Sequence, residues 1–390
     1  MKILLINHYA GSPNLGMEFR PYYVTKGWVK LGHEVLIVGG SYSHLRKVQP
    51  QSCEEMIDDV RYRWVKVNPY KGNGIGRIIS MFSFVTKLYC NYRRYLRNFK
   101  PDIVIASSTY PLDIYPAYRI ARHYHAKLIY EVHDLWPLSP MELGGYSKKH
   151  PFIRIMQKAE DDCYRYADAV VSMLPKAEEH MREHGLTRDK FHYVPNGIVL
   201  SDWNNPKGIP EEHGLLLSKL RAEGKFIVGF AGAHGIANSL YAVIDAVSSL
   251  TEQNVVLVLV GGGQEKENLI KYAHKKGVTN VYFLLPINKL AIPNLLKEMD
   301  VLYIGLQKQS LFRFGISPNK MFDYMMAAKP IIQAIDAGNN LVREADCGID
   351  VEPDNVSEIS KAILALKSMS EEERRKLREI GKKFDLYNHT

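Results

Sequence analysis

The sequence predicts an α/β protein built from two doubly wound parallel sheets, and three observations support this fold class. The chain has 390 residues, which suits two domains of about 190 residues better than one. Its hydrophobic content of 46% and charged content of 24% are ordinary for a globular protein with a large core. Short apolar runs alternate with helical patterns, starting with a strand, a glycine-containing loop, a helix and a strand. Ligands gather at the carboxyl ends of such strands, and we expect these ends to face a cleft between the domains.

Residues 1–203 are expected to form the N-terminal domain. Its strands are expected at residues 2–7, 34–38, 103–106, 128–132 and 169–173, and its helices at 19–31 and 78–99. Gly11, Ser12, Asn14 and Gly16 lie in the loop after the first strand. They are candidates for an acceptor or phosphate contact, and a plain turn is the alternative. The loop lacks the G-x-G-x-x-G fingerprint, which argues against a nicotinamide or flavin enzyme.

Most of the net charge of +9 belongs to this first domain. Residues 1–203 hold 28 Lys and Arg against 20 Asp and Glu, whereas residues 204–390 hold 23 against 22. The stretch 71–100 is basic and contains no acidic residue, a pattern that favours an anionic phospholipid surface or phosphate-bearing partners. Its apolar positions 78, 82, 85, 89, 92, 96 and 99 form one helical stripe, and positions 81, 84, 88 and 95 form a second. We expect the first stripe to pack on the sheet, and residues 72–76 and the second stripe to lie in a membrane interface.

His133 and Asp134 follow the apolar strand 128–132 in the segment EVHDLWPLSP. Polar side chains at the carboxyl end of a strand face the ligand cleft in this architecture. An isolated His-Asp pair is also common as a structural feature. The residues alone therefore leave a structural and a catalytic role open.

Residues 223–390 are expected to form the C-terminal domain, after a linker at 204–222 that contains two prolines and two glycines. Its strands are expected at residues 225–232, 255–260, 281–285, 301–305 and 331–335. Asn196 and Gly197, before the linker, predict a turn without chemistry. Ser370 and Glu373 predict a capping box at the start of a final charged helix.

The segment RFGISPNKMFDYMMAAKPIIQA, residues 313–334, carries the strongest ligand-binding pattern. Ser317 and Pro318 predict a helix that begins near residue 318, where free N–H groups and the helix dipole favour an anion. Lys320, in the first turn, is unfavourable there unless an anion such as a phosphate binds. Asp323 lies about one turn further, roughly 5 Å along the axis, where its carboxylate can accept bonds from ribose hydroxyls. This spacing matches a nucleoside diphosphate, and a solvated Lys and Asp on a surface helix is the alternative.

Two segments of the chain resemble a known family. SPNKMFDYMMAAKPII is similar to the donor-site helix of the family 4 retaining glycosyltransferases, and HDLWP is similar to the RDLWP pattern of the same enzymes. The resemblance points to the bacterial O-antigen and capsule polysaccharide branch, similar to N-acetyl-fucosamine-type transferases. It implies the GT-B fold, with two Rossmann-like domains that bind the acceptor (N-terminal) and the donor (C-terminal). The chain departs from the family at Asp323, which replaces the usual Glu, and in lacking the first Glu of the E-x7-E motif.

The resemblance also implies roles for individual residues. His133 is expected to touch the donor sugar, Asp134 to contact the acceptor or orient a neighbour, and Lys320 to stabilise the departing diphosphate. The donor site is expected to include Gly232, Asn238, Leu285, Arg313, Gly315, Ile316, Ser317, Asn319, Lys320 and Asp323. Asn238 stands about where the family has a Lys, and backbone groups at Leu285 are expected to read the base.

We therefore expect a retaining glycosyltransferase that moves an N-acetylamino hexose or a deoxyhexose from a UDP-linked donor to a polyprenyl-diphosphate-linked saccharide. No cofactor or metal is expected to be required. The four cysteines are widely separated, without metal-binding spacing, and are expected to be reduced thiols. The sequence shows neither a signal peptide nor a run of about 20 apolar residues that could span a bilayer. We expect a cytoplasmic protein that is held at the inner face of the membrane by the basic residues of 71–100.

Three alternatives remain open. An epimerase of the same fold would bind the same donor and use His133 and Asp134 as acid and base. A nonenzymatic, membrane-bound partner of a transferase would explain the missing basic residues and the short Asp323 side chain. Nucleic-acid binding would explain the basic domain, but the core-like aromatic residues argue against it. The segment after Ser370 is shorter than in the family, so we expect the usual crossover helix to be missing or truncated.

Overall fold

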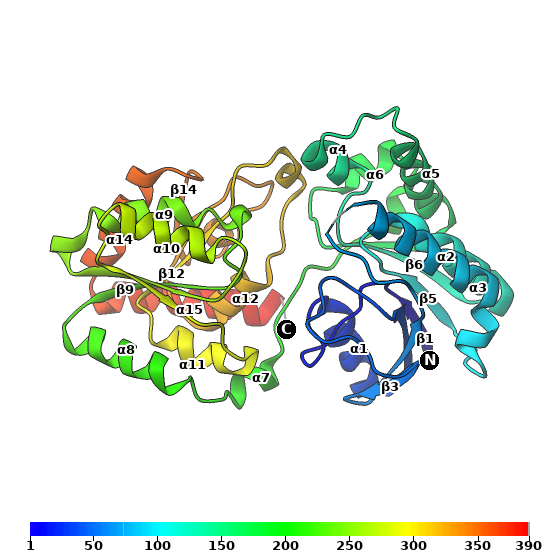
Figure 1. The fold of residues 1–390 in the computed structure, drawn as a ribbon, viewed down its shortest axis with the longest axis horizontal. Helices are drawn as coiled ribbons and strands as arrows, with labels where there is room; N and C mark the ends of the chain where they lie inside the picture. Colours follow the sequence, from blue (N-terminus) through cyan, green and yellow to red (C-terminus); the bar gives the residue numbers. More distant parts are fainter. Residues whose placement is uncertain (73, 389–390) are drawn as a thin grey trace. The chain divides into compact units, whose positions relative to one another are not determined.

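The computed structural model describes residues 1–72 and 74–388 of the chain (Figure 1). The chain divides into two compact units, Met1–Pro195 and Asn196–Thr390, so the boundary lies before Trp203, where the first domain was expected to end. Part of the expected linker is the helix α8 (Glu211–Ala222), whose Leu217 and Leu220 are buried in the core of the second unit. Burial of these leucines outweighs the turn signal of the prolines and glycines around them.

The first unit is built on an eight-stranded sheet with the order β3-β4-β2-β1-β5-β6-β7-β8. Its strands are β1 (Lys2–Ile6), β2 (Glu34–Gly40), β3 (Glu54–Ile57), β4 (Val60–Val65), β5 (Ile103–Ala106), β6 (Lys127–Val132), β7 (Ala169–Ser172) and β8 (Phe191–Tyr193). The pairing of β3 with β4 is antiparallel, and the other neighbouring pairs are parallel. The five strands expected above are present, and residues 191–203, which resemble the strand and turn that close the first domain in the family, contribute β8. The β3–β4 hairpin was not predicted.

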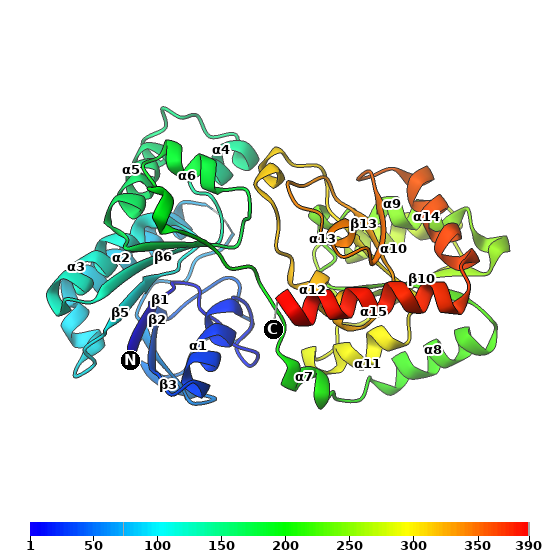
Figure 2. The same ribbon diagram turned by 180° about the vertical axis from the view of Figure 1, so that it is seen from behind.

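Helices cover both faces of this sheet (Figures 1 and 2). They are α1 (Arg20–Lys30), α2 (Ile75–Leu96), α3 (Ile114–Tyr124), α4 (Leu138–Gly144), α5 (Pro151–Tyr166) and α6 (Glu178–Glu183). On one face, Trp28 and Val29 of α1 pack against a cluster that includes Ile37 and Tyr62. On the other face, α2 and α3 pack against each other and against the sheet. Parallel strands covered in this way are buried on both sides, as their continuous apolar sequences predict.

The prediction that the second apolar stripe of α2 lies in a membrane interface was wrong. Met81, Phe84 and Leu88 were expected at a membrane, but they are at most 1% exposed and belong to the core. The buried face of the helix is wider than one stripe because α2 packs against α3 as well as against the sheet. Ile75 and Ile79, at the start of the helix, are 76% and 56% exposed. Residue 73 of the segment 72–76, which was also expected at the membrane, lies outside the described residues.

The second unit is built on a six-stranded sheet with the order β11-β10-β9-β12-β13-β14, and its neighbouring strands pair in parallel. Its strands are β9 (Phe226–Ala231), β10 (Val255–Val260), β11 (Val281–Leu284), β12 (Val301–Gly305), β13 (Ile331–Ala334) and β14 (Gly348–Val351). The sequence analysis predicted the first five of these strands and missed β14. The two sheets together confirm the predicted fold class of two doubly wound parallel-sheet units.

Two hydrophobic clusters cover the two faces of this second sheet. Besides α8, its helices are α7 (Leu200–Asn204), α9 (Leu240–Ser248), α10 (Lys266–Lys275), α11 (Ile292–Lys297), α12 (Asn319–Met326), α13 (Leu341–Glu344), α14 (Val356–Ser368) and α15 (Glu371–Asn388). One cluster joins the sheet to α8, α11, α12 and α13, and the other joins it to α9, α10 and α14. Apolar side chains of α12 are buried in the first of these clusters, and this packing fixes the helix that carries Lys320 and Asp323.

The last helix, α15, packs against α12 within the second unit (Figure 2). Its start is the predicted capping box, because the Glu373 carboxylate accepts from the Ser370 N–H at 2.7 Å and the Glu373 N–H donates to the Ser370 hydroxyl. Within the described residues, each helix is too short or too polar to cross a membrane.

Candidate active site

Lys320 is the centre of the candidate donor site in the second unit. Its ammonium group donates a hydrogen bond to the amide oxygen of Asn238 and lies 4.6 Å from the centre of the Phe230 ring. A Cβ atom at Gly232 would lie 3.6 Å from the same nitrogen. Tyr324, one turn along α12, holds this end of the helix to β9, because its hydroxyl accepts from the Ala231 N–H at 2.9 Å. Three residues that the sequence analysis predicted for the donor site, Gly232, Asn238 and Lys320, are thus neighbours.

The charge of Lys320 is poorly compensated. Burial lowers the pKa of its ammonium group to about 8. Within the described part of the chain, Lys320 forms no ion pair with a carboxylate. The positive end of the α12 dipole lies in the same turn, which adds to the cost of a cation there. A bound anion would relieve both effects.

His234 adds a neutral imidazole to this cluster. The side chain is fully buried, and neither of its ring nitrogens has a hydrogen-bond partner among the described residues. Burial and the charges of Lys266 and Lys320 lower its pKa to about 4. A Cβ at Gly261 would lie 3.3 Å from its Nε2 atom, and one at Gly263 would lie 2.4 Å from its carbonyl oxygen, so glycines are required along this loop.

The loop before α12 is held by two asparagines. Asn339 bonds the backbone of Ile316 twice: its amide oxygen accepts from the Ile316 N–H at 2.8 Å, and its Nδ2 donates to the Ile316 carbonyl at 3.1 Å. Asn196 bonds Ser317 twice, through its backbone N–H to the hydroxyl at 2.8 Å and through its Nδ2 to the carbonyl at 2.7 Å. The hydroxyl of Ser317 therefore does not cap the helix as predicted, and α12 begins at Asn319.

Asp323 lies on α12 among a different set of neighbours. Protein surrounds the partly exposed carboxyl group, and this burial raises its pKa to about 6, although the Lys289 charge and a hydrogen bond from Trp203 act in the opposite direction. The negative charge of Asp385 contributes to the rise. The free protein therefore disfavours the ionised form of Asp323, as it disfavours the charged form of Lys320.

A polar cluster lies at the carboxyl ends of adjacent strands in the first unit. The Nε2 atom of His133, just after β6, lies 3.0 Å from the Ser107 hydroxyl and 3.4 Å from the Glu131 carboxylate. Ser107 donates to Glu131 at 2.6 Å, and the Arg20 guanidinium donates to the other carboxylate oxygen at 2.9 Å. Arg20 also donates to the carbonyl of Pro195 at 2.8 Å. Each member of this cluster is buried and hydrogen-bonded.

The carboxylate of Glu131 sets the charge of His133. Burial favours the neutral imidazole, but the hydrogen bond and charge of Glu131 overcome it and raise the pKa of His133 above its ordinary value. Burial would raise the pKa of Glu131, but Arg20 and His133 lower it well below its ordinary range. The Asp134 side chain is exposed, although the protein around its carboxyl group removes solvent from it and raises its pKa above the ordinary value. The group that orients His133 is therefore Glu131, whereas the sequence analysis had considered Asp134 for such a role.

Two family models match the chain, one in each unit. Residues 16–197 match the glycosyl transferase 4-like domain, and residues 217–384 match the glycosyl transferases group 1 domain. The chain belongs to these glycosyltransferase families. The resemblance on which the sequence analysis relied is confirmed at this level.

Individual relatives of this glycosyltransferase are distant. The chain is 24% identical over 215 residues to TuaH of Bacillus subtilis (strain 168), whose name describes it as a teichuronic acid biosynthesis glycosyltransferase. This match covers 53% of the chain and spans about half, 50%, of the length of TuaH.

Solved structures resemble the whole chain. HepE of Anabaena in complex with UDP-glucose has a TM-score of 0.69 and 17% identity, and sucrose-phosphate synthase of Thermosynechococcus elongatus has a TM-score of 0.75 and 15% identity. Both matches cover 100% of this chain and 95% of the other. The likeness shows that this glycosyltransferase has the GT-B fold.

Several donor residues predicted for the glycosyltransferase lie outside the contacts of Lys320. Arg313 is exposed, donates to the Ser310 carbonyl at 2.7 Å and stacks on Phe314 at 4.3 Å. The Leu285 carbonyl accepts a hydrogen bond from Nε2 of His213 at 2.9 Å. Asn319 is exposed at the first position of α12, and Gly315 adopts a φ of 96°, which favours glycine. Their roles in donor binding stay predictions.

The predicted acceptor loop closes on itself. The Ser12 hydroxyl accepts from the Leu15 N–H at 3.2 Å, and the Gly16 N–H donates to the Ser12 carbonyl at 2.8 Å. A Cβ at Gly11 would lie 2.0 Å from the Gly16 carbonyl oxygen, so the turn requires glycine there. Asn14 is exposed on this turn. The acceptor role of the loop stays a prediction.

Proposed function

We propose that the protein transfers a sugar from a nucleotide diphosphate sugar to a saccharide acceptor. The observation that carries this proposal is Lys320, a partly buried cation at a helix start that has no ion-pair carboxylate among the described residues. Such a cation, with backbone N–H groups of the helix start, provides the environment that binds a diphosphate. Asp323 would accept hydrogen bonds from the ribose hydroxyls.

The proposed chemistry proceeds with retention and needs no protein nucleophile. The bond between the anomeric carbon and the diphosphate oxygen breaks, and the acceptor hydroxyl bonds to that carbon from the same face. The hydroxyl proton passes to the departing diphosphate. Lys320 would stabilise the charge that develops on this leaving group, a role that preorganised cations fill in a site shielded from water. His133, held by Glu131, would contact the transferred sugar. We propose that this reaction requires no metal.

The donor and acceptor classes follow from the relatives. The HepE structure was obtained with UDP-glucose, which supports a UDP-linked donor. The name of TuaH supports a role in cell-surface polysaccharide synthesis, where the acceptor would be a polyprenyl-diphosphate-linked saccharide. An N-acetylamino hexose or deoxyhexose is the proposed sugar. These proposals make the protein a peripheral enzyme at the inner face of the cytoplasmic membrane.

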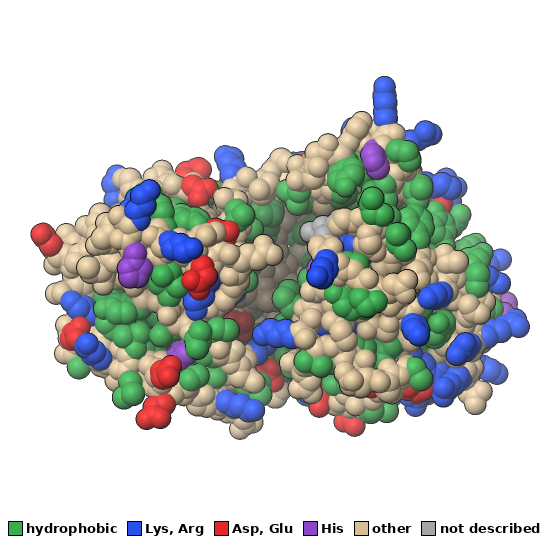
Figure 3. Space-filling model, viewed as in Figure 1, with side chains coloured by type: hydrophobic (Ala, Val, Ile, Leu, Met, Phe, Trp, Pro, Cys, Tyr) green, Lys and Arg blue, Asp and Glu red, His purple; other side chains and the backbone are tan. Residues whose placement is uncertain are grey.

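The surface of α2 supports a membrane contact. The exposed side chains of Ile75 and Ile79 lie at the start of this helix, and exposed Arg93 and Arg94 lie in its last turn. Figure 3 shows many Lys and Arg side chains, with apolar side chains between them, on the face of the first unit that carries α2 and α3. Such a mixture suits an anionic lipid surface.

Turnover of sugar nucleotides tests the proposed activity. Purified protein is incubated with UDP-, GDP- and dTDP-sugars and a lipid-linked saccharide fraction, and release of nucleoside diphosphate is measured. We expect nucleoside diphosphate to be released from the sugar nucleotides of one base only. Lys320→Ala should lower the rate of this release by about 10²–10³-fold. The control Lys308→Ala changes an exposed lysine that pairs with Asp336 at 2.8 Å, and it should retain the activity. Conversion of one sugar nucleotide into another without acceptor would favour the epimerase, and the absence of any turnover would favour the nonenzymatic partner.

A further inference from the structure

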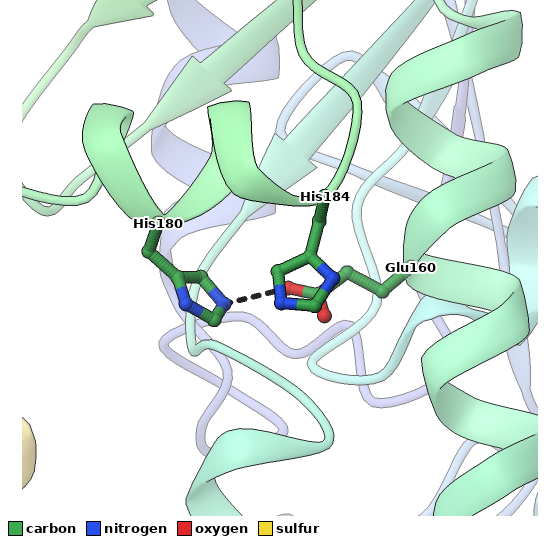
Figure 4. A group of neighbouring side chains, drawn as sticks. All are labelled: Glu160, His180 and His184. Atoms are coloured by element: carbon green, nitrogen blue, oxygen red, sulfur yellow. Dashed lines mark hydrogen bonds and ion pairs between the residues drawn. The ribbon is translucent and has the colours of Figure 1, made fainter.

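Two histidines and a buried glutamate meet between α5 and α6 of the first unit (Figure 4). Glu160 belongs to α5, His180 belongs to α6, and His184 follows the last residue of α6. Each offers one possible ligand atom, and these atoms lie within 4.8 Å of one another. The three residues stand apart from the contacts of both Lys320 and His133, and the proposed function does not use them.

The local sequence explains why the two rings converge. His180 and His184 are four residues apart, so both lie on the same side of the short helix. Figure 4 shows both rings directed toward the Glu160 carboxylate from the neighbouring helix. The centres of the two rings are 4.7 Å apart, and Nε2 of His180 lies 3.3 Å from a Glu160 oxygen. That second distance is close to the ligand–ligand spacing of about 3.3 Å that follows from zinc–ligand bonds of about 2.0–2.1 Å in a tetrahedral site.

Polar neighbours hold two of the three residues in place. The Tyr164 hydroxyl donates to Glu160 at 2.9 Å, and Gln157 donates to its other oxygen at 2.8 Å. The Asp161 carboxylate lies 3.0 Å from Nδ1 of His184. The Gln157 side-chain amide lies 2.8 Å from the same Nδ1 atom, so polar neighbours occupy this nitrogen and Nε2 is the nitrogen left for a metal ion. A carboxylate that orients a histidine in this way is the usual outer partner of a metal ligand.

We propose that Glu160, His180 and His184 bind a divalent transition metal ion of the zinc class. Imidazole and carboxylate are ligands that zinc accepts, and a cluster of two histidines and one acidic residue supplies three of its four positions. Glu160 is 1% exposed, and a bound cation would compensate its buried charge. His180 and His184 also line a cavity of about 520 Å³, so the fourth position is open to water. The ion would tie α6 to α5.

Cobalt titration tests this site directly. The full chain without a histidine tag is freed of metal with a chelator and titrated with Co²⁺, whose visible absorption reports imidazole and carboxylate coordination. We expect one equivalent to bind per chain, Zn²⁺ to displace it, and Zn²⁺ to raise the melting temperature of the protein. His184→Gln should weaken Co²⁺ binding by at least the factor of about 10–100 that is typical for loss of an outer partner.

A matched control separates this site from general histidine binding. His274→Gln changes an exposed histidine of α10 in the second unit and leaves the three ligands intact, so it should bind Co²⁺ as the wild type does. His180→Gln should behave as His184→Gln does, and far-ultraviolet circular dichroism verifies that each variant is folded. Equal Co²⁺ binding by His184→Gln and His274→Gln would overturn the proposal, as would a wild type that binds less than one equivalent.

Discussion

The Lys320 ammonium group donates its hydrogen bond to the amide oxygen of Asn238, a neutral partner on the turn that follows β9. The resemblance predicted that Asn238 stands about where the family has a Lys, and Lys320 is the cation that the structure places beside it. Because Asn238 holds the ammonium group without neutralising it, the cation is positioned before an anion arrives. Positioning of this kind lowers the entropic cost of binding.

Nucleoside diphosphate binding should weaken as the pH rises through the pKa of Lys320. This pKa is lowered by burial to about 8, so the free protein loses the charge between about pH 7 and 9. We expect the dissociation constant to rise about tenfold over this range, because about nine tenths of the lysines are charged at the start and about one tenth at the end. Titration calorimetry at each pH measures this dissociation constant. Lys320→Arg keeps its charge over this range and serves as the control. If binding by that variant depends on pH as binding by the wild type does, a group other than Lys320 causes the pH dependence.

Asp323→Asn should stabilise the free protein while weakening nucleotide binding. Burial raises the carboxyl pKa from 3.8 to about 6, so the native state holds this proton more tightly than the unfolded chain does. The free energy of unfolding therefore falls as the pH rises from about 4 to 6. Removing the charge should raise it by about 1–3 kcal/mol at pH values above 6. Denaturant unfolding at pH 7.5 and pH 4 measures the difference, which should disappear at the lower pH. A destabilised variant at pH 7.5 would contradict this account.

Glu131→Gln should lower the pKa of His133. The charge and hydrogen bond of Glu131 raise that pKa against the effect of burial, and a neutral amide removes the charge. The same change leaves Arg20 without its buried counterion, and we expect a loss of about 3 kcal/mol in unfolding free energy. NMR titration of the imidazole protons measures the pKa. Asp134→Asn is the comparison, and a larger shift in that variant would restore Asp134 as the group that controls His133.

Charge reversal on α2 should release the protein from anionic vesicles. Arg93→Glu with Arg94→Glu removes two exposed cations, each expected to contribute about 1 kcal/mol at such a surface. Vesicle flotation measures the bound fraction, and Ile75→Ser with Ile79→Ser should reduce it independently of salt. Lys148→Glu with Lys149→Glu reverses exposed charge elsewhere in the first unit as a control. Equal binding by all variants would exclude α2 as the membrane contact.

The strands that the sequence predicted most accurately are continuous apolar runs. Residues 103–106, 255–260 and 301–305 were predicted with the bounds of β5, β10 and β12. These strands lie inside their sheets, where burial on both faces removes any need for polar residues. The edge strands β3 and β14 were missed because they are short and only partly buried, and β3 begins with two glutamates. Their positions depend on pairing with a neighbour rather than on their own pattern.

The candidate site was predicted where one segment or one strand end determined it. Lys320 was predicted from its own segment, and Gly232 and Asn238 were predicted from the resemblance to the family; the structure brings the three together at the carboxyl end of β9 and the start of α12. Glu131 was missed, although it lies two residues before His133 and strand periodicity places both on one side.

Other site residues carried no local signal. Asn196 bonds Ser317 across 121 positions of the sequence, and Asn339 bonds Ile316 across 23. Their roles depend on the paths of loops, which apolar patterns do not encode. His234 was not predicted, because its burial depends on the packing of Gly261 and Gly263 around it.

The most direct test of the donor site is the melting temperature of the protein with UDP, GDP, dTDP, ADP and NAD in turn. A ligand at 100 times its dissociation constant adds about 2.7 kcal/mol to the unfolding free energy. We predict that one nucleoside diphosphate, UDP, raises the melting temperature of the wild type and of Lys308→Ala. Lys320→Ala and Asp323→Asn should lose most of this rise. If none of the nucleotides raises the melting temperature, or if the Lys320 and Asp323 variants respond as the wild type does, the assignment of these two residues to a nucleotide diphosphate is wrong.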